Sequence, residues 1–265
     1  MKSISRYFWI GYTAARANLA YVIETSSRIV FMTVILYVFM RLWTVVYAGA
    51  NAERLAGLTL SQMIWYLVVT ESVTLSAPRI WSEIDQDVRT GRLAVQLIYP
   101  LSYVGGHLGR AMGQRVVRFV VNMAVGSSIA LLLVGPIPFH AAGLAMFVLV
   151  LPAAFLLDFL GNFLVGLCAF WLESTVGLAL LYMRTVQLLG GMLLPIDVYP
   201  ETIRHLVKLL PFASMVYAPG RMFVTPGTAL LFESIWNQGL ALILFSGAVA
   251  VVQSVALRRL FANGG

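Results

Sequence analysis

The chain has 265 residues, of which 60% are hydrophobic and only 11% are charged. A soluble globular domain has about 45–50% apolar and about 25% charged residues, so this chain has too few polar side chains to cover a water-facing surface. The net charge of +7 does not indicate a nucleic-acid-binding protein, because the basic residues flank apolar runs and form no soluble basic face. The composition therefore predicts an integral membrane protein.

The first 28 residues predict a helix that lies in the membrane surface. On a helical wheel, apolar side chains such as Phe8 and Tyr12 share one face, while Lys2 and Arg16 share the opposite face. A frayed polar tail is the alternative, but the aromatic run Tyr7–Trp9 disfavours it.

Six apolar runs then read as membrane-spanning helices, which need about 20 apolar residues. They comprise residues 29–47, 63–77, 116–134, 141–171, 176–194 and 235–257. The second is the shortest, and the fourth is long enough to tilt or to kink at Pro152. Because helices satisfy their own backbone hydrogen bonds in lipid, we predict an all-α integral membrane fold with one domain over residues 1–265.

The distribution of basic residues predicts the orientation of these spans. The two termini and the loops after the second and fourth spans carry 12 Lys and Arg residues, and the loops after the first, third and fifth spans carry 4. We therefore expect both termini and residues 80–102 to be cytoplasmic, and residues 195–233 to be external. The external segment holds five of the ten prolines yet stays apolar, which predicts short re-entrant helices before the last span. An ordinary external loop packed on the bundle is the alternative.

Three ionisable residues fall inside the predicted spans, namely Glu71, Asp158 and Arg184. Charges are costly in a membrane, so their presence there indicates function. Asp158 and Arg184 lie at similar depth and could form an ion pair, and a Glu71–Arg184 pair is the other possibility. These residues either border a path for cargo or hold the bundle together as buried pairs.

Residues 80–102 contain a short helix with two unlike faces. Its apolar face comprises Ile80, Trp81, Ile84 and Val88, and its polar face comprises Glu83, Gln86, Asp87 and Arg89. Gly91 permits a turn after this helix, and Pro100 ends the apolar segment that follows. Such a helix on the cytoplasmic side could transmit a push from a soluble partner, or could simply lie at the membrane interface.

The motifs of several enzyme classes are missing from the sequence. There is no G-x-x-x-x-G-K-[ST] loop for ATP phosphates, no G-x-S-x-G for that type of serine hydrolase, and no H-E-x-x-H or cysteine cluster for a metal. We therefore expect no catalytic residues, no metal ligands and no cofactor in this chain.

Two stretches resemble the ABC type-2 permease family. "IDQDVRTGRLAVQLIYPLS" (84–102) is similar to the segment after that family's second span, and the matching elements are Arg89, Gly91, Leu93, Leu97, Pro100 and Leu101. "GGMLLPIDVYPETIRHLVKLLPFA" (190–213) is similar to the family's segment after the fifth span. The usual Gly-Thr-Leu-Glu is here Gly91-Arg92-Leu93-Ala94, which indicates a divergent branch.

The resemblance implies an ATP-driven exporter in a bacterial-type inner membrane. Two permease subunits, identical or related, would pair with two ABC ATPase subunits, which would bind ATP and Mg. The coupling contact with the ATPase would comprise Trp81, Glu83, Ile84, Asp85, Val88, Arg89 and Gly91, with a second contact at Glu173. Glu71 and Arg184 would border the cargo path, and Pro195, Pro200 and Pro211 would belong to an outer gate.

The cargo stays open among drug-like, lipid and glycan molecules. Two other functions are alternatives to the exporter. One is an ion-coupled carrier or channel that uses Glu71 and Asp158 as ion sites, and the other is an intramembrane enzyme acting on lipid, which the missing motifs disfavour.

Overall fold

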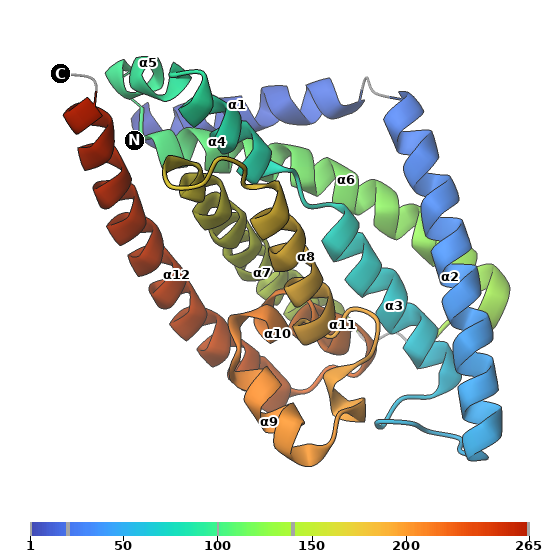
Figure 1. Ribbon diagram of the computed structural model, residues 1–265. Coiled ribbons are helices and arrows are strands. Elements are labelled where there is room, and N and C mark those ends of the chain that lie inside the picture. The colour runs from blue at the N-terminus through green and yellow to red at the C-terminus, as the bar shows by residue number, and fades with distance from the viewer. Residues whose placement is uncertain (1, 20–21, 100, 139–140, 264–265) are drawn as a thin grey trace.

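The computed structural model describes residues 2–19, 22–99, 101–138 and 141–263. The regular structure in these ranges is helical, as the sequence predicts. Figure 1 shows long helices that run side by side and shorter helices gathered at the two ends. Four helices are long and apolar enough to cross a membrane, at Ile29–Ala50, Tyr103–Val134, Ala141–Phe170 and Thr228–Arg258.

The second and fifth predicted spans are shorter helices, so six full spans are not confirmed. α3 comprises Leu60–Leu75 and α8 comprises Val176–Leu189. At about 1.5 Å per residue they are about 24 Å and about 21 Å long, less than the roughly 30 Å of a hydrocarbon core. Every side chain of α3 from residue 63 to residue 73 is buried. α3 is therefore a central helix that other helices surround.

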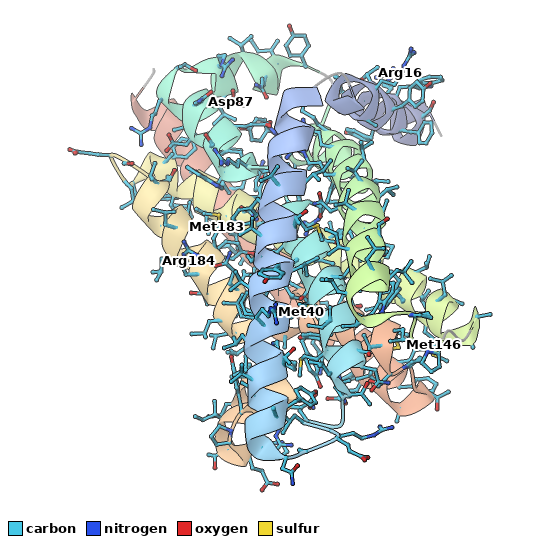
Figure 2. The ribbon with its side chains drawn as sticks, turned by 90° about the vertical axis from the view of Figure 1, so that its right-hand side faces the viewer. Arg16, Met40, Asp87, Met146, Met183 and Arg184 are labelled. Atoms are coloured by element: carbon cyan, nitrogen blue, oxygen red, sulfur yellow. The ribbon has the colours of Figure 1, made fainter. Side chains whose placement is uncertain are left out.

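α1 (Lys2–Leu19) lies crosswise over one end of the bundle, whereas α2 (Val22–Ala50) runs along the bundle (Figures 1 and 2). The aromatic side chains of Phe8, Trp9 and Tyr12 are exposed, so they do not pack on the protein. An exposed aromatic face on a crosswise helix is the geometry expected of an interfacial helix.

α6 (Tyr103–Val134) begins well before the predicted third span, because residues 103–115 are helical and not a loop. Gly105, Gly109 and Gly113 recur every four residues. Gly109 and Gly113 bring α6 into backbone contact with α1, and Gly105 makes room for the ring of Tyr7. A Cβ atom at Gly113 would lie 2.0 Å from the carbonyl oxygen of Gly11. Only glycine therefore allows the two helices to cross this closely.

α7 (Ala141–Leu167) continues into a short 3₁₀ turn, η1 (Cys168–Phe170), and packs against the last helix, α12 (Thr228–Asn263). Pro152 lies inside α7. The middle of α7 is strongly buried, which makes it the second helix at the centre of the bundle.

Four short helices connect α8 to α12. They are η2 (Ile196–Val198), α9 (Glu201–Leu209), α10 (Pro211–Met215) and α11 (Tyr217–Val224). α9 lies at the end opposite α1, and the chain then turns back into the bundle (Figure 1), where residues 213–220 are buried. A Cβ atom at Gly220 would lie 2.7 Å from the Tyr66 ring, so α11 packs tightly on α3. Whether these helices re-enter the membrane stays a prediction.

α4 (Ile80–Arg89) and α5 (Arg92–Ile98) lie at the same end as α1 (Figure 1). The predicted helix and turn are confirmed, since Gly91 between them has a φ of 70°, a left-handed conformation that favours glycine. Pro100, which we expected to stop the second segment, lies outside the described residues.

Candidate functional site

The apolar face of α4 is directed into the bundle. Ile80 and Ile84 are 1% and 0% exposed and pack in a cluster with residues of α7. Gly166 of α7 makes room for this contact, because a Cβ atom there would lie 2.7 Å from the Ile84 Cβ. The side chain of Ile84 thus packs inside the chain, and Val88 is half-buried in the same cluster. Their contact with an ATPase stays a prediction.

Asp85 links α4 to the turn between α7 and α8. Its carboxylate accepts hydrogen bonds from Arg89 Nε at 2.7 Å and from Thr175 Oγ1 at 2.8 Å. The bond from Arg89, with the one from Thr175, holds the pKa of the Asp85 carboxyl below its ordinary value. Arg89 also donates to the Leu172 carbonyl at 3.3 Å. Glu173 is exposed in this turn, so the two predicted coupling contacts belong to adjoining segments.

Asp87 links α4 to α5 and to the start of α6. It is 4% exposed, and its Oδ2 accepts from Gln96 Nε2 at 2.9 Å and from the Tyr103 hydroxyl at 3.2 Å. Arg92 Nε lies 3.3 Å from Asp87 Oδ1 and completes the set of partners. A buried carboxylate needs several such partners.

Glu83 extends this network along α6. Its Oε2 lies 3.3 Å from Arg110 Nη1 and 3.6 Å from His107 Nδ1. Burial raises the pKa of the Glu83 carboxyl, but the neighbouring imidazole of His107 and the guanidinium of Arg110 together outweigh it and place the pKa below its ordinary value. The three acids of α4 are therefore held by α5, α6 and the α7–α8 turn, and α4 is a junction of the fold.

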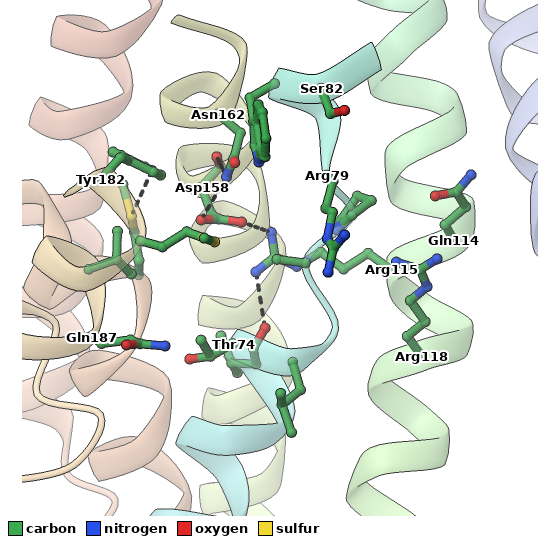
Figure 3. A pocket seen from close by; sticks show the side chains of 18 of the residues that line it. Thr74, Arg79, Ser82, Gln114, Arg115, Arg118, Asp158, Asn162, Tyr182 and Gln187 are labelled. Atoms are coloured by element: carbon green, nitrogen blue, oxygen red, sulfur yellow. Dashed lines mark hydrogen bonds and ion pairs between the residues drawn. The ribbon is translucent and has the colours of Figure 1, made fainter. Parts of the chain in front are cut away.

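A cavity of about 770 Å³ lies between α4 and α10. Its walls come from α3, α6, α7 and α8 and from the segment between α3 and α4 (Figure 3). Its polar and charged lining comprises Thr74, Arg79, Ser82, Glu83, Gln86, Gln114, Arg115, Arg118, Asp158, Asn162, Tyr182 and Gln187. Its volume is in the range of about 300–1,000 Å³ that small-molecule sites occupy. The cavity is therefore the best candidate for a ligand site in the described residues.

Asp158 is paired with Arg115 and not with Arg184. Arg115 Nη1 lies 2.5 Å from Asp158 Oδ2, and Asn162 Nδ2 donates to Asp158 Oδ1 at 3.2 Å. Arg184 is exposed on α8, where its Nη1 donates to Gln187 Oε1 at 2.8 Å. Both predicted pairings of Arg184 are thus corrected. Asp158 does line the cavity, as a path residue would.

Glu71 is 1% exposed, and its Oε1 makes no hydrogen bond with the described residues. It lies outside the lining of the cavity, so its predicted place on the cargo path has no geometric support. Within the described ranges, no three His, Cys, Asp or Glu side chains gather closely enough to hold a metal ion.

The three prolines of the predicted outer gate each precede or begin a short helix: Pro195 before η2, Pro200 before α9 and Pro211 as the first residue of α10. Asp197 joins these helices, since it accepts from the Tyr217 hydroxyl at 2.7 Å and pairs with Arg221 at 3.2 Å and Lys208 at 3.3 Å. Met215, the last residue of α10, and Val216 after it line the cavity, so the end of α10 borders it directly.

This helix order, with the charged helix α4 and the Gly91 turn after α3, is accompanied by a family match. The family model described as "ABC-2 family transporter protein" matches residues 17–264, which is nearly the whole chain. The chain belongs to the ABC-2 transporter family. No curated protein matches the chain. As an ABC-2 protein with long apolar helices, it is a multi-pass membrane component of a transport system.

Several residues of this ABC-2 protein's site were missed in the sequence analysis. Arg115 and Arg118 were counted as loop and span-edge residues, yet they lie inside α6 and line the cavity. His107 falls outside the six predicted spans, yet it lies between Glu83 and Asp87. The Gly105-x-x-x-Gly109-x-x-x-Gly113 spacing is a helix-packing signal that could have extended the third helix to include all three.

Proposed function

We propose that this ABC-2 protein is the permease subunit of an ATP-driven exporter, in which a separate ABC ATPase subunit hydrolyses ATP. The observation that carries the proposal is the position of α4. Trp81, Ser82 and Glu83 of this helix line the cavity, while Asp85 and Arg89 bind the neighbouring α7–α8 turn. A displacement of α4 would therefore reach the cavity and three other helices at once.

The ATPase would bind at the end of the bundle that carries α1, α4 and α5, which the excess of basic residues assigns to the cytoplasm. Exposed side chains there include Val95 and Ile98 of α5 and Tyr99 after it, at 55%, 82% and 63% exposure. Arg89, Gly91 and Glu173 are also exposed at this end. We infer that α5 and the α7–α8 turn make the contact and that α4 transmits it inward.

The assembly would contain two ATPases and two permeases, identical or related, with ATP and Mg bound by the ATPases. Closure of the ATPase dimer would push on α5 and α4, and the segment from Pro195 to Pro211 would open on the opposite side. Support for the last step comes from Met215 and Val216, which follow shortly after Pro211 and border the cavity.

Co-purification of the ATPase subunit tests this proposal. Tagged protein is purified from gently solubilised native membranes, and the bound ATPase activity is measured. We expect Ile98→Asp to remove that activity, because a charge would enter an apolar contact. Leu209→Asp is the matched control, since Leu209 is 78% exposed on α9 at the opposite end. A well-folded preparation without ATPase in several detergents would favour the ion-coupled carrier or channel instead.

A further inference from the structure

We propose that the cavity binds an amphipathic anion, a molecule with one carboxylate, sulfate or phosphate group and an apolar body. The inference deepens the proposed function, since it names the cargo class of that cavity and rests on the cavity being the cargo site. Three arginines line the cavity, Arg79 before α4 and Arg115 and Arg118 on α6. Figure 3 shows the three side chains converging from two sides.

The acidic groups of the cavity are already occupied. Asp158 accepts hydrogen bonds from Arg115 and from Asn162, which uses both of its oxygens. Glu83 is paired with Arg110, whose side chain lies outside the lining. A cationic ligand would therefore have to displace an existing ion pair, and it would also meet the positive charges of the arginines.

Hydrogen-bond donors, in contrast, are in excess. Arg115 is 2% exposed, and its Nε has no partner among the described residues although its other nitrogens bind Asp158, Phe155 O and Val73 O. An unpaired donor on a buried guanidinium is costly, so an acceptor from a ligand would be favourable there.

Two further donors surround the same space. The guanidinium of Arg79 is exposed and is not paired with any residue that the structure describes. Gln187 uses its Oε1 to accept from Arg184, which leaves its amide nitrogen as the group to offer a ligand. An anion with two or three oxygens matches such a set of donors, whereas an alcohol or amine does not.

The rest of the lining is suited to the apolar body of the ligand. Phe31, Trp81, Met183, Val186, Met215 and Val216 contribute apolar surface to the same cavity. An inorganic anion would leave this apolar surface unused, and a neutral oil would offer no acceptor to the guanidinium of Arg79.

Trp81 lines the cavity and supplies the assay. The purified chain, in nanodiscs of phosphatidylcholine and without an ATPase, is titrated with 12-bromododecanoate, whose bromine quenches nearby indole fluorescence. Subtraction of the signal from Trp81→Phe isolates Trp81 among the six tryptophans. The matched neutral and cationic probes are 12-bromododecanol and (12-bromododecyl)trimethylammonium.

We expect the anion to quench Trp81 saturably. Its concentration for half-maximal quenching should be at least about tenfold lower than that of the other two probes. Arg79→Gln should raise that concentration about tenfold without changing the weak response to the alcohol. Arg41→Gln, which removes an exposed charge of α2 outside the cavity, should change neither. Equal or stronger quenching by the alcohol or the cation, or no saturable quenching in folded protein, would overturn the inference.

Two competition arms identify the source of the anion. Phosphatidylglycerol placed in the disc would displace the probe if the ligand is a lipid headgroup, and added octanoate would displace it if the ligand arrives from water. The assay also separates the two proposals. Anion binding by a chain that captures no ATPase from native membranes would contradict the exporter alone, and a captured ATPase without anion preference in the discs would contradict the cargo class alone.

Discussion

Arg115 of α6 and Asp158 of α7 form an ion pair inside the bundle, with 2.5 Å between Nη1 and Oδ2. α6 and α7 also contact each other through aromatic side chains, since Phe119 meets Phe147 and Phe155, and Tyr103 meets Phe163. The ion pair adds a polar contact to this packing. Phe155 lies against the same guanidinium, with 4.3 Å from Arg115 Cζ to the ring centroid. The ion pair therefore links α6 to α7 and also forms part of the cavity wall.

Removing one partner of this pair should destabilise the protein strongly. We expect Arg115→Leu to lower the free energy of unfolding by about 3–5 kcal/mol, because Asp158 would remain buried without its cation. The double variant Arg115→Leu with Asp158→Leu should recover most of that loss. Thermal unfolding in detergent measures both, with the exposed Arg184→Gln as the control. Equal losses in the single and double variants would contradict the pairing argument.

The α1–α6 crossing offers a test of backbone contact. Gly113→Leu should detach α1 from α6, because a side chain at that position would overlap the backbone of Gly11. Amide hydrogen exchange of residues 5–17 should then become much faster. Gly106→Leu is the matched control on the same helix, since a Cβ atom there meets nothing within 4 Å. Unchanged exchange in Gly113→Leu would show that α1 does not depend on this contact.

The link from α4 to the α7–α8 turn should depend on acidity. The pKa of Asp85 is lowered in the folded protein, so its stabilising effect is present at neutral pH and is lost as the pH falls through that lowered value. Asp85→Asn should lower the unfolding temperature at pH 7, and the difference from the parent protein should begin to shrink near about pH 4 and vanish only below the lowered pKa of Asp85. Thr175→Val is a second variant, because it removes one partner of Asp85 and leaves the carboxylate in place.

The turn between α4 and α5 should be essential for coupling. Gly91 has a φ of 70°, whereas proline fixes φ near −65°, so Gly91→Pro must redirect α5 relative to α4. In membranes that contain the partner, we expect ATP hydrolysis to continue while transport is lost. Gly91→Asn, which tolerates the left-handed conformation, should retain most transport. Normal transport in Gly91→Pro would remove the coupling role from this turn.

The long apolar helices could be predicted from the sequence because hydropathy reports them directly. The runs that begin at residues 29, 116, 141 and 235 correspond to α2, α6, α7 and α12. The first turns of α6 were missed because His107, Arg110 and three glycines lower the local hydropathy. Those residues are helical since α1 and α4 cover them, which is a long-range effect that no local pattern contains.

The charged residues were harder to place. Asp158 and Arg184 lie at similar depth in the predicted spans, which suggested that they pair. The prediction was wrong because Arg115, the true partner of Asp158, falls just outside the predicted span 116–134. The two faces of α4 were recognised, but a helical wheel does not say what each face meets. Its acids are directed to other helices because α5 and α6 supply the matching basic side chains.

The crossing of α1 over α6 has a mechanical consequence. Where two helices touch through glycine backbones, no flexible side chains lie between them to absorb a displacement. A tilt of α6 would therefore swing α1 through the same angle, and the exposed rings of Phe8 and Trp9 would sweep sideways among the lipid headgroups. The lipid headgroups would resist this movement of α1. Part of the work of each transport cycle would then be done against the membrane surface.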